Sequence, residues 1–249
     1  LVLLVPRTAS VAEVDPLLVC ALSLKNIEEC DRYISRNPRD AHAYAKRAMN
    51  LKGKREFVRA LADINKAIEI DPSKANFYNI RAMIFKGKGE RDRAIADYSR
   101  AIEINGRESL YYEWRADLWV EKGEHNRAIA DYTKFLEIDK KNEVIFLKRG
   151  ELFANKGEHY RAIADCTRAI ELDRKYEDAY FVRGKSLEAS GKSQQALLDF
   201  EKALALNPRN SDAAAKIMEM REKIAVAARG QASPVSSTPI QSAPPPAQA

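Results

Sequence analysis

Small, aromatic and apolar residues recur along this chain at a fixed interval of 34 residues. One column of the pattern is aromatic, the next is small and the third is always alanine, in this order: Tyr44, Tyr78, Tyr112, Phe146, Tyr180; Ala48, Ala82, Ala116, Gly150, Gly184; Ala60, Ala94, Ala128, Ala162, Ala196. The columns define five adjoining units, at residues 41–74, 75–108, 109–142, 143–176 and 177–210. A repeat of this length predicts a solenoid, because each unit hides its apolar face only by stacking on its neighbours.

Each unit is predicted to form two helices joined by a tight turn. In the fifth unit, Tyr180 and Gly184 lie about one helical turn apart, and Gly191 ends that run. A second run with the same spacing follows and ends at Asn207 and Pro208. The alanine and glycine columns indicate where two helices approach closely, because a larger side chain would not fit there.

The order of aromatic and small columns resembles the tetratricopeptide repeat family, and the resemblance covers residues 41–210 of the 249-residue chain. It implies an all-α fold, an α-solenoid in which antiparallel helix pairs stack into a right-handed superhelix. It also implies that a partner binds in a concave groove lined by the first helix of each pair. This expectation about function is an analogy drawn from the fold.

The segments on either side of the repeats are predicted to cover the two ends of the stack. Residues 13–40 indicate a degenerate helical hairpin that caps the first repeat. Residues 211–228 indicate a last helix that covers the fifth repeat. Residues 229–249 are rich in Pro, Ser, Gln and Ala, so we expect them to form a disordered tail.

The first residues, 1–12, combine an apolar run with small residues at Ser10 and Ala12, a spacing typical of a signal-peptidase site. We interpret them as a truncated signal peptide, and we expect a bacterial protein that is periplasmic or secreted. The alternatives are a vector-derived protease tag at Leu4–Arg7 or an ordinary chain terminus. The alternative location is the cytoplasm.

The overall composition excludes few classes of protein. The chain is 45% hydrophobic and 31% charged, with few glycines and prolines, which fits an all-helical domain. The formal net charge is +6, with 42 basic residues facing 36 acidic ones, so charge alone is a weak argument for a nucleic-acid partner. No apolar run approaches the roughly 18 residues that predict a transmembrane helix. Oligomeric state cannot be inferred from these totals.

The groove implied by the family resemblance would be lined by one face of the first helices. Its candidate residues are Met49, Met83, Asn79, Glu113, Asp117, Val120, Leu147, Glu151, Phe181 and Lys185. Methionine and aromatic side chains among carboxylates suit an amphipathic or extended peptide with some basic character. Leu147 and Phe181 are equally compatible with a place in the core.

One known kind of ligand is not expected in this groove. Family members that hold the C-terminal tails of chaperones use a clamp of basic residues and asparagine. Ala45 and Met49, then Glu113 and Asp117, stand where that clamp would need lysine and asparagine.

Two charged columns are filled in all five repeats, one arginine on each first helix and one aspartate on each second helix: Arg47, Arg81, Arg115, Arg149, Arg183 and Asp63, Asp97, Asp131, Asp165, Asp199. We interpret them as structural ion pairs between the helices of a hairpin. Two alternatives remain, namely pairing of each aspartate with the arginine four residues earlier on its own helix, and a ligand-binding role for the arginines.

Further basic residues lie on the second helices, in two columns: Arg59, Arg93, Arg127, Arg161 and Lys66, Arg100, Lys134, Arg168, Lys202. Glutamates alternate with them at helical spacing, which indicates a solvated outer surface. The alternative function from another class, nucleic-acid binding through this convex face, would favour basic residues without interleaved acids.

No catalytic constellation or cofactor motif was found, and we expect neither an active site nor a cofactor. His125 and His159 lie one repeat apart, but no other ligand completes a metal site. Gly191-Lys192-Ser193 resembles the end of a phosphate loop, but no strand precedes it and its leading glycine is absent. The sequence therefore predicts a non-catalytic scaffold that binds a protein or peptide whose identity it does not reveal.

Cys20 and Cys30 lie on the two helices of the predicted N-terminal cap and are the candidates for a disulfide. In an exported protein such a bond would stabilise the cap by about 2–3 kcal/mol. In a cytosolic protein both residues would be small buried hydrophobes. Cys166 lies in an apolar column and is expected to be an inert core residue.

We predict that Cys20 and Cys30 are bonded in protein purified from its native cells, because export would expose them to an oxidising compartment. Alkylation under denaturing, non-reducing conditions followed by mass spectrometry should modify Cys166 and leave the other two unmodified. Alkylated thiols at both Cys20 and Cys30 would contradict the disulfide and remove one support for export.

Overall fold

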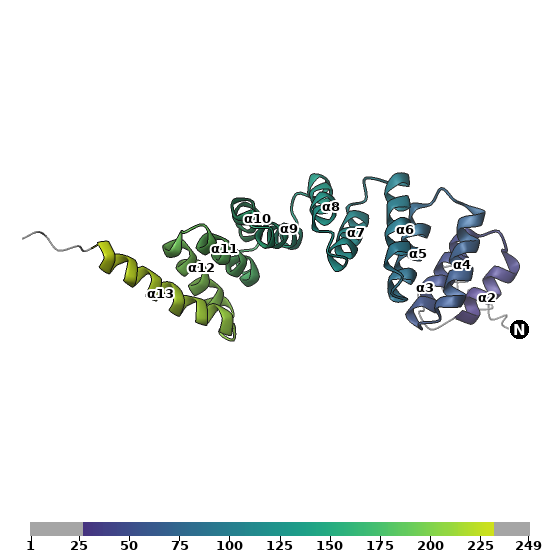
Figure 1. Ribbon diagram of the computed structural model, residues 1–249. Helices are drawn as coiled ribbons and strands as arrows, with labels where there is room; N and C mark the ends of the chain where they lie inside the picture. The colour runs from purple at the N-terminus through teal and green to yellow at the C-terminus, as the bar shows by residue number, and fades with distance from the viewer. Residues whose placement is uncertain (1–26, 232–249) are drawn as a thin grey trace, which may run out of the picture. The chain divides into compact units, whose positions relative to one another are not determined.

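The computed structural model describes residues 27–231 of the chain, and every regular element in that part is a helix. The helices are α2 (Ile27–Arg36), α3 (Ala41–Gly53), α4 (Phe57–Ile70), α5 (Ala75–Gly87), α6 (Arg91–Ile104), α7 (Ser109–Glu121), α8 (His125–Ile138), α9 (Glu143–Asn155), α10 (His159–Leu172), α11 (Glu177–Ala189), α12 (Ser193–Leu206) and α13 (Ser211–Gln231) (Figure 1). The five predicted repeats each contain one pair of these helices. The predicted class, an all-α solenoid of helix pairs, is confirmed.

Several predictions concern residues outside 27–231. They are the signal peptide at 1–12, the first helix of the N-terminal cap, and the tail beyond residue 231. Cys30 is fully buried, but Cys20 lies outside the described residues, so the disulfide stays a prediction. The last helix, α13, continues three residues past the end predicted at Ala228. It reaches Gln231, the last described residue.

The described chain forms two compact units, and their boundary falls inside α9, between Ile145 and Phe146. In the first unit, each helix from α2 to α7 packs against the next one along the chain. In the second unit, α10, α11, α12 and α13 pack in the same successive manner. Antiparallel pairs stacked in sequence order are therefore the building principle of each unit.

A column of buried side chains at intervals of 34 residues lies in the core of each unit. Its members are at most 2% exposed: Cys30, Ile64, Tyr98, Tyr132, Cys166 and Phe200. The small column lies opposite, and a Cβ atom placed on Gly184 would lie 2.7 Å from the Phe200 ring. Because Cys30 of α2 belongs to the same column, α2 takes the place of the second helix of a preceding repeat.

The turn inside each hairpin requires one residue in the left-handed region. Gly89, Gly123, Gly157 and Gly191 occupy it with φ between 75° and 81°. In the first hairpin the position is held by Arg55, with φ of 62°. A residue with a Cβ atom is strained in this conformation. The backbone of the first turn is therefore less stable than the backbone of the four turns that have glycine.

The arginine and aspartate columns pair with each other across each hairpin. Arg81 Nε and Nη2 donate to Asp97 Oδ2 and Oδ1, both at 2.8 Å. The same two-bond arrangement joins the other pairs at 2.6–2.8 Å: Arg47 and Asp63, Arg115 and Asp131, Arg149 and Asp165, Arg183 and Asp199. The aspartates are buried, so each carboxylate is held in a largely desolvated bidentate pair.

The third donor of the guanidinium reaches the preceding hairpin. Arg81 Nη1 donates to Asn65 Oδ1 at 2.9 Å, and Arg47, Arg115 and Arg183 bond equivalent residues at 2.6–3.1 Å, namely Asp31, Ser99 and Thr167. One arginine on a first helix thus bonds two second helices. It also lies 5.6–5.9 Å from the ring of the aromatic residue three positions earlier.

The arginines four residues before the aspartates have other partners. Arg59, Arg93 and Arg161 pair with glutamates three residues earlier on the outer surface. The alternative in which these arginines neutralise the buried aspartates is therefore wrong. The aspartates face the neighbouring first helix, where the column arginine already occupies both carboxylate oxygens.

We predict that Asp97→Ala lowers the free energy of unfolding by about 3 kcal/mol, because it leaves the half-buried Arg81 charge without its carboxylate. Urea denaturation of the full chain measures this loss. Asp92→Ala is the control, since Asp92 lies on the same helix with an 82% exposed side chain, and it should cost less than about 1 kcal/mol. Equal losses in the two variants would contradict a special role for the column pair.

We predict that Arg55→Gly raises the free energy of unfolding by about 0.5–1 kcal/mol, because glycine removes the strain of the left-handed residue. The reciprocal change, Gly89→Arg, should lower it by a similar amount in the next hairpin. Thermal and urea unfolding of both variants test this pair. A loss of stability in Arg55→Gly would show that the packing of the arginine side chain on Phe57 outweighs the backbone strain.

Candidate functional site

A pocket of about 430 Å³ opens between α3 and α5 in the first unit. Its walls come from three kinds of residue, aliphatic or aromatic, amide and basic: Ala45, Met49, Phe77, Ile80, Met83; Asn50, Asn76, Asn79; His42, Lys46. Three of the predicted groove residues, Met49, Asn79 and Met83, meet here. These first helices of neighbouring repeats pack against each other, which brings equivalent positions of α3 and α5 together.

The floor of the pocket is apolar and fixed. Phe77 and Ile80 are 0% and 5% exposed, and they belong to the hydrophobic core of the first repeats. The His42 ring stands edge-on to Phe77 with 5.3 Å between ring centroids. Met49 and Met83 are half-buried at the rim, where flexible thioether side chains adapt to the shape of a bound group.

Asn79, which lines the pocket, also carries a buried amide oxygen without a hydrogen bond. The residue is only 7% exposed, and its Nδ2 donates to Asn76 Oδ1 at 3.3 Å. Its Oδ1 atom is buried and accepts no hydrogen bond. A buried acceptor left in this state costs about 1–3 kcal/mol. The oxygen has almost no accessible surface, so it is not open to a group that enters the pocket.

The predicted groove residues of α7 lie outside this pocket. The Tyr132 hydroxyl donates to Asp117 Oδ1 at 2.6 Å, so this carboxylate is tied to the second helix of its own hairpin. Burial and the charge of Asp117 both raise the pKa of the Tyr98 hydroxyl. Glu113 is half-buried, and Val120 is 36% exposed.

In the second unit the predicted groove residues have mixed roles. Leu147 is 5% exposed and packs in the hydrophobic core, so its assignment to a groove is wrong. Phe181 is half-buried against Phe200, with 5.7 Å between ring centroids, and the Lys185 ammonium lies 5.7 Å from the Phe181 ring. Glu151 is exposed to solvent.

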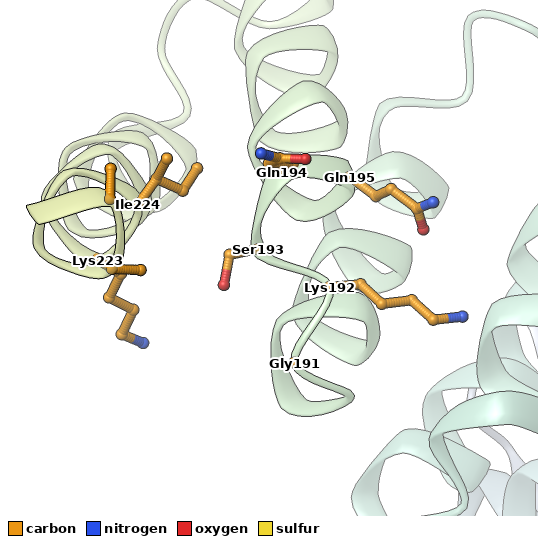
Figure 2. A pocket seen from close by; sticks show the side chains of 9 residues that line it. Gly191, Lys192, Ser193, Gln194, Gln195, Lys223 and Ile224 are labelled. Carbon is orange, nitrogen blue, oxygen red and sulfur yellow. The ribbon is translucent and has the colours of Figure 1, made fainter. Parts of the chain in front are cut away.

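A second pocket of about 430 Å³ lies between the start of α12 and α13 and contains Gly191, Lys192 and Ser193. Figure 2 shows that Lys192 and Gln195 extend away from α13, so the polar groups do not converge. Lys223, on the α13 side, is paired with Glu188 at 2.6 Å. This arrangement is a turn between helices and not a phosphate site.

The basic columns of the second helices are largely neutralised. Seven ion pairs on these outer surfaces of the described chain join residues three apart at 2.5–2.8 Å: Arg59 and Glu56, Lys66 and Glu69, Arg93 and Glu90, Arg100 and Glu103, Lys134 and Glu137, Arg161 and Glu158, Arg168 and Glu171. Arg127 stacks on Trp119 at 4.6 Å. This surface offers few unpaired cations to a phosphate backbone.

Groups suited to other chemistry are dispersed. Among residues 27–231, no three His, Cys, Asp or Glu side chains are grouped closely enough to hold a metal ion. Burial raises the pKa of the Cys166 thiol to about 12, so this thiol is protonated at neutral pH. No helix in the described range is both long and apolar enough to cross a membrane.

The sequence did not single out His42, Lys46 and Asn76, although they line the same pocket as Met49 and Asn79. The available signal was their spacing, because His42 and Lys46 lie one helical turn apart on the face that carries Met49. Residues at these three positions occur in every repeat, so their spacing does not show which pair of repeats forms a pocket.

Comparison with protein families identifies the class of this solenoid. Models of the tetratricopeptide repeat match residues 80–143, 145–176 and 177–210. The chain belongs to the tetratricopeptide repeat family. No curated protein sequence matches it significantly.

Solved structures of the same fold agree with this assignment. The C-terminal part of a repeat protein from Cytophaga hutchinsonii superposes with a TM-score of 0.71 at 18% identity, covering 86% of this chain and 88% of that one. YrrB gives a TM-score of 0.67 at 22% identity, covering 76% and 97% of the two chains. MamA gives 0.62 at 19% identity, with 69% and 94% covered. At these identities the likeness establishes the fold alone.

Proposed function

We propose that this protein is a non-catalytic scaffold that holds a segment of a partner protein in the pocket between α3 and α5. The observation that carries the proposal is the pocket itself, which has an apolar floor of Phe77 and Ile80 and the side chains of Met49 and Met83 beside it. A peptide supplies an apolar side chain for the space between Met49 and Met83.

The family and the fold support this proposal at a general level. Stacked helical repeats present extended surfaces on which partner proteins bind. YrrB, a structural neighbour, is described as a tetratricopeptide repeat protein with an unusual peptide-binding site. Fold likeness at that identity does not transfer a site, so the pocket of this chain is the stronger support.

The alternative function, nucleic-acid binding through the outer basic columns, has less support. Most of those cations are paired with glutamates three residues away. Nucleic-acid binding requires several cations that exchange counterions for phosphates, together with exposed rings for stacking on single strands. Export to the periplasm or beyond the cell stays a prediction from the sequence.

We predict that peptides selected by the full chain from a random library lose at least about tenfold in affinity on Met83→Glu. The new charge would lie at the rim of an apolar floor and exclude the peptide's apolar side chain. Fluorescence anisotropy with labelled selected peptides measures the change, and circular dichroism checks that the variant is folded.

Met218→Glu is the matched control, because Met218 is 74% exposed on α13 and lies far along the chain from the pocket. It should bind the same peptides with unchanged affinity. Equal affinities of Met83→Glu and the unmodified protein would locate peptide binding elsewhere and overturn the proposed site.

A further inference from the structure

The turns of the first two hairpins carry most of the net charge of the chain. Residues 52–59 and 86–93, which we name the basic tips, contain eight basic and three acidic residues, whereas the whole chain has a formal net charge of +6. The equivalent segments of the later repeats, 120–127, 154–161 and 188–195, together contain five basic and four acidic residues. The excess of positive charge therefore belongs to the first two repeats and not to the repeat pattern.

The two basic tips lie side by side. Helix α4 packs against α5 in the stack. Phe57 begins α4 and Gly87 ends α5, and a Cβ atom placed on Gly87 would lie 3.0 Å from the Phe57 ring. This contact joins the first turn to the second. Residues of the basic tips are absent from the lining of the pocket between α3 and α5, so the two surfaces are separate.

Four cations of the basic tips have no acidic partner. The other four are paired with carboxylates, namely Arg59, Lys88, Arg91 and Arg93. Lys52, Lys54, Arg55 and Lys86 form no salt bridge with any of the residues 27–231. Lys52 is half-buried, and the other three are exposed. Four unpaired cations on two adjoining turns produce a local positive potential.

One of these cations is kept in spite of backbone strain. Arg55 adopts a φ of 62° at the position where the other four hairpins have glycine. Its guanidinium lies 6.0 Å from the Phe57 ring and has no carboxylate partner in the described chain to offset the strain. Strained residues of this kind cluster at functional sites, so the charge of Arg55 indicates a ligand.

An aliphatic side chain projects from the same surface. Val58, in the first turn of α4, is 80% exposed, more than any other large hydrophobic residue of the described chain. The equivalent positions of the later repeats hold residues with a polar group: Asp92, Asn126, Tyr160, Gln194. A valine in this position gains free energy only when a partner removes it from water.

We infer that the basic tips bind the surface of an anionic phospholipid membrane. The four unpaired cations face the lipid phosphates, and Val58 enters the layer between the headgroups and the acyl chains. A bilayer complements both features of this protruding surface, because it offers an extended layer of negative charge with an apolar phase directly beneath it. This inference goes beyond the peptide site and does not depend on it.

A nucleic acid would complement the cations but not the valine. Single strands bind to exposed aromatic rings on which the bases stack. The rings near the basic tips are not available for stacking, since Phe57 is half-buried against Gly87 and Phe85 is buried, with the Arg93 guanidinium 4.5 Å from its ring. The combination of free cations and one exposed aliphatic group therefore favours a membrane.

The experiment is co-sedimentation of the full chain with vesicles made of equal parts of phosphatidylglycerol and phosphatidylcholine. We expect binding that weakens as salt is added, and no binding to vesicles of phosphatidylcholine alone. The triple variant Lys52→Gln, Lys54→Gln, Lys86→Gln should bind the anionic vesicles at least about tenfold more weakly at low ionic strength. Circular dichroism checks that it is folded.

A charge-matched control keeps net charge from explaining the result. The triple variant Lys140→Gln, Lys141→Gln, Lys202→Gln removes three exposed lysines outside the basic tips, and it should change the affinity by less than about twofold. Val58→Asn should weaken binding about threefold at every salt concentration, because the lost contact is apolar. Its control is Val226→Asn, at a 59% exposed position of α13, which should have no effect.

Arg55→Gly separates binding from folding. This variant is expected to be more stable than the unmodified protein, because glycine removes the strain of the left-handed residue. It should nevertheless bind the anionic vesicles about threefold more weakly at low ionic strength, because it lacks one cation of the basic tips. A loss of binding in a more stable protein is not caused by unfolding.

Several outcomes would overturn the inference. Equal affinity of the two triple variants, or equal binding to neutral and anionic vesicles, would show that the basic tips do not recognise anionic lipid. Lysine-dependent binding to a single-stranded RNA oligonucleotide, by a chain that does not bind the vesicles, would assign the basic tips to nucleic acid instead. Unchanged affinity in Val58→Asn would overturn the insertion of Val58.

Discussion

A single guanidinium that bonds two second helices from its place on a first helix holds each part of this stack in register. Arg81 illustrates the arrangement, with two bonds to Asp97 in its own hairpin and one to Asn65 in the hairpin before. Apolar helix faces attract one another without direction and tolerate sliding, whereas a planar fork fits its carboxylate in one geometry. Because the column repeats at the same position, α3, α5, α7 and α11 are each fixed at the same height relative to both neighbouring second helices.

That register determines where a binding surface can form. The pocket between α3 and α5 exists because Met49 and Met83 occupy equivalent heights on successive first helices, with Phe77 beneath them. A shift by one helical turn would place other residues opposite each other. Buried ion pairs lose much of their attraction to desolvation, so the gain from the arginine column is in the uniqueness of the packing more than in net stability. We therefore regard the ion pairs and the pocket as parts of one arrangement.

The sequence predicted the elements that depend on identical residues in every repeat. The helix pairs follow from the small and aromatic columns, and the partners Arg81 and Asp97 follow from two columns filled without exception. The third partner of the arginine was missed, because Asn65 and Ser99 stand in a column whose residue types vary and share only a hydrogen-bonding group. The burial of Leu147 was left open by the sequence for another reason, since a half-buried column becomes core or surface according to what the adjacent helix presents.

The end of the stack shows how far the arrangement extends. The position on α13 that corresponds to the arginine column is Ile217, which is 7% exposed and packs with the core. An arginine there would need an aspartate on a following second helix, but the sequence has Ser233 at the corresponding position. A buried cation without its carboxylate is strongly destabilising, so an apolar residue is the stable choice. Arg221, one helical turn later, bonds Glu201 at 2.8 Å instead. Glu201 stands in the column of Asn65 and Ser99, so this position of the last hairpin also receives a hydrogen bond from the next helix, here from an exposed arginine.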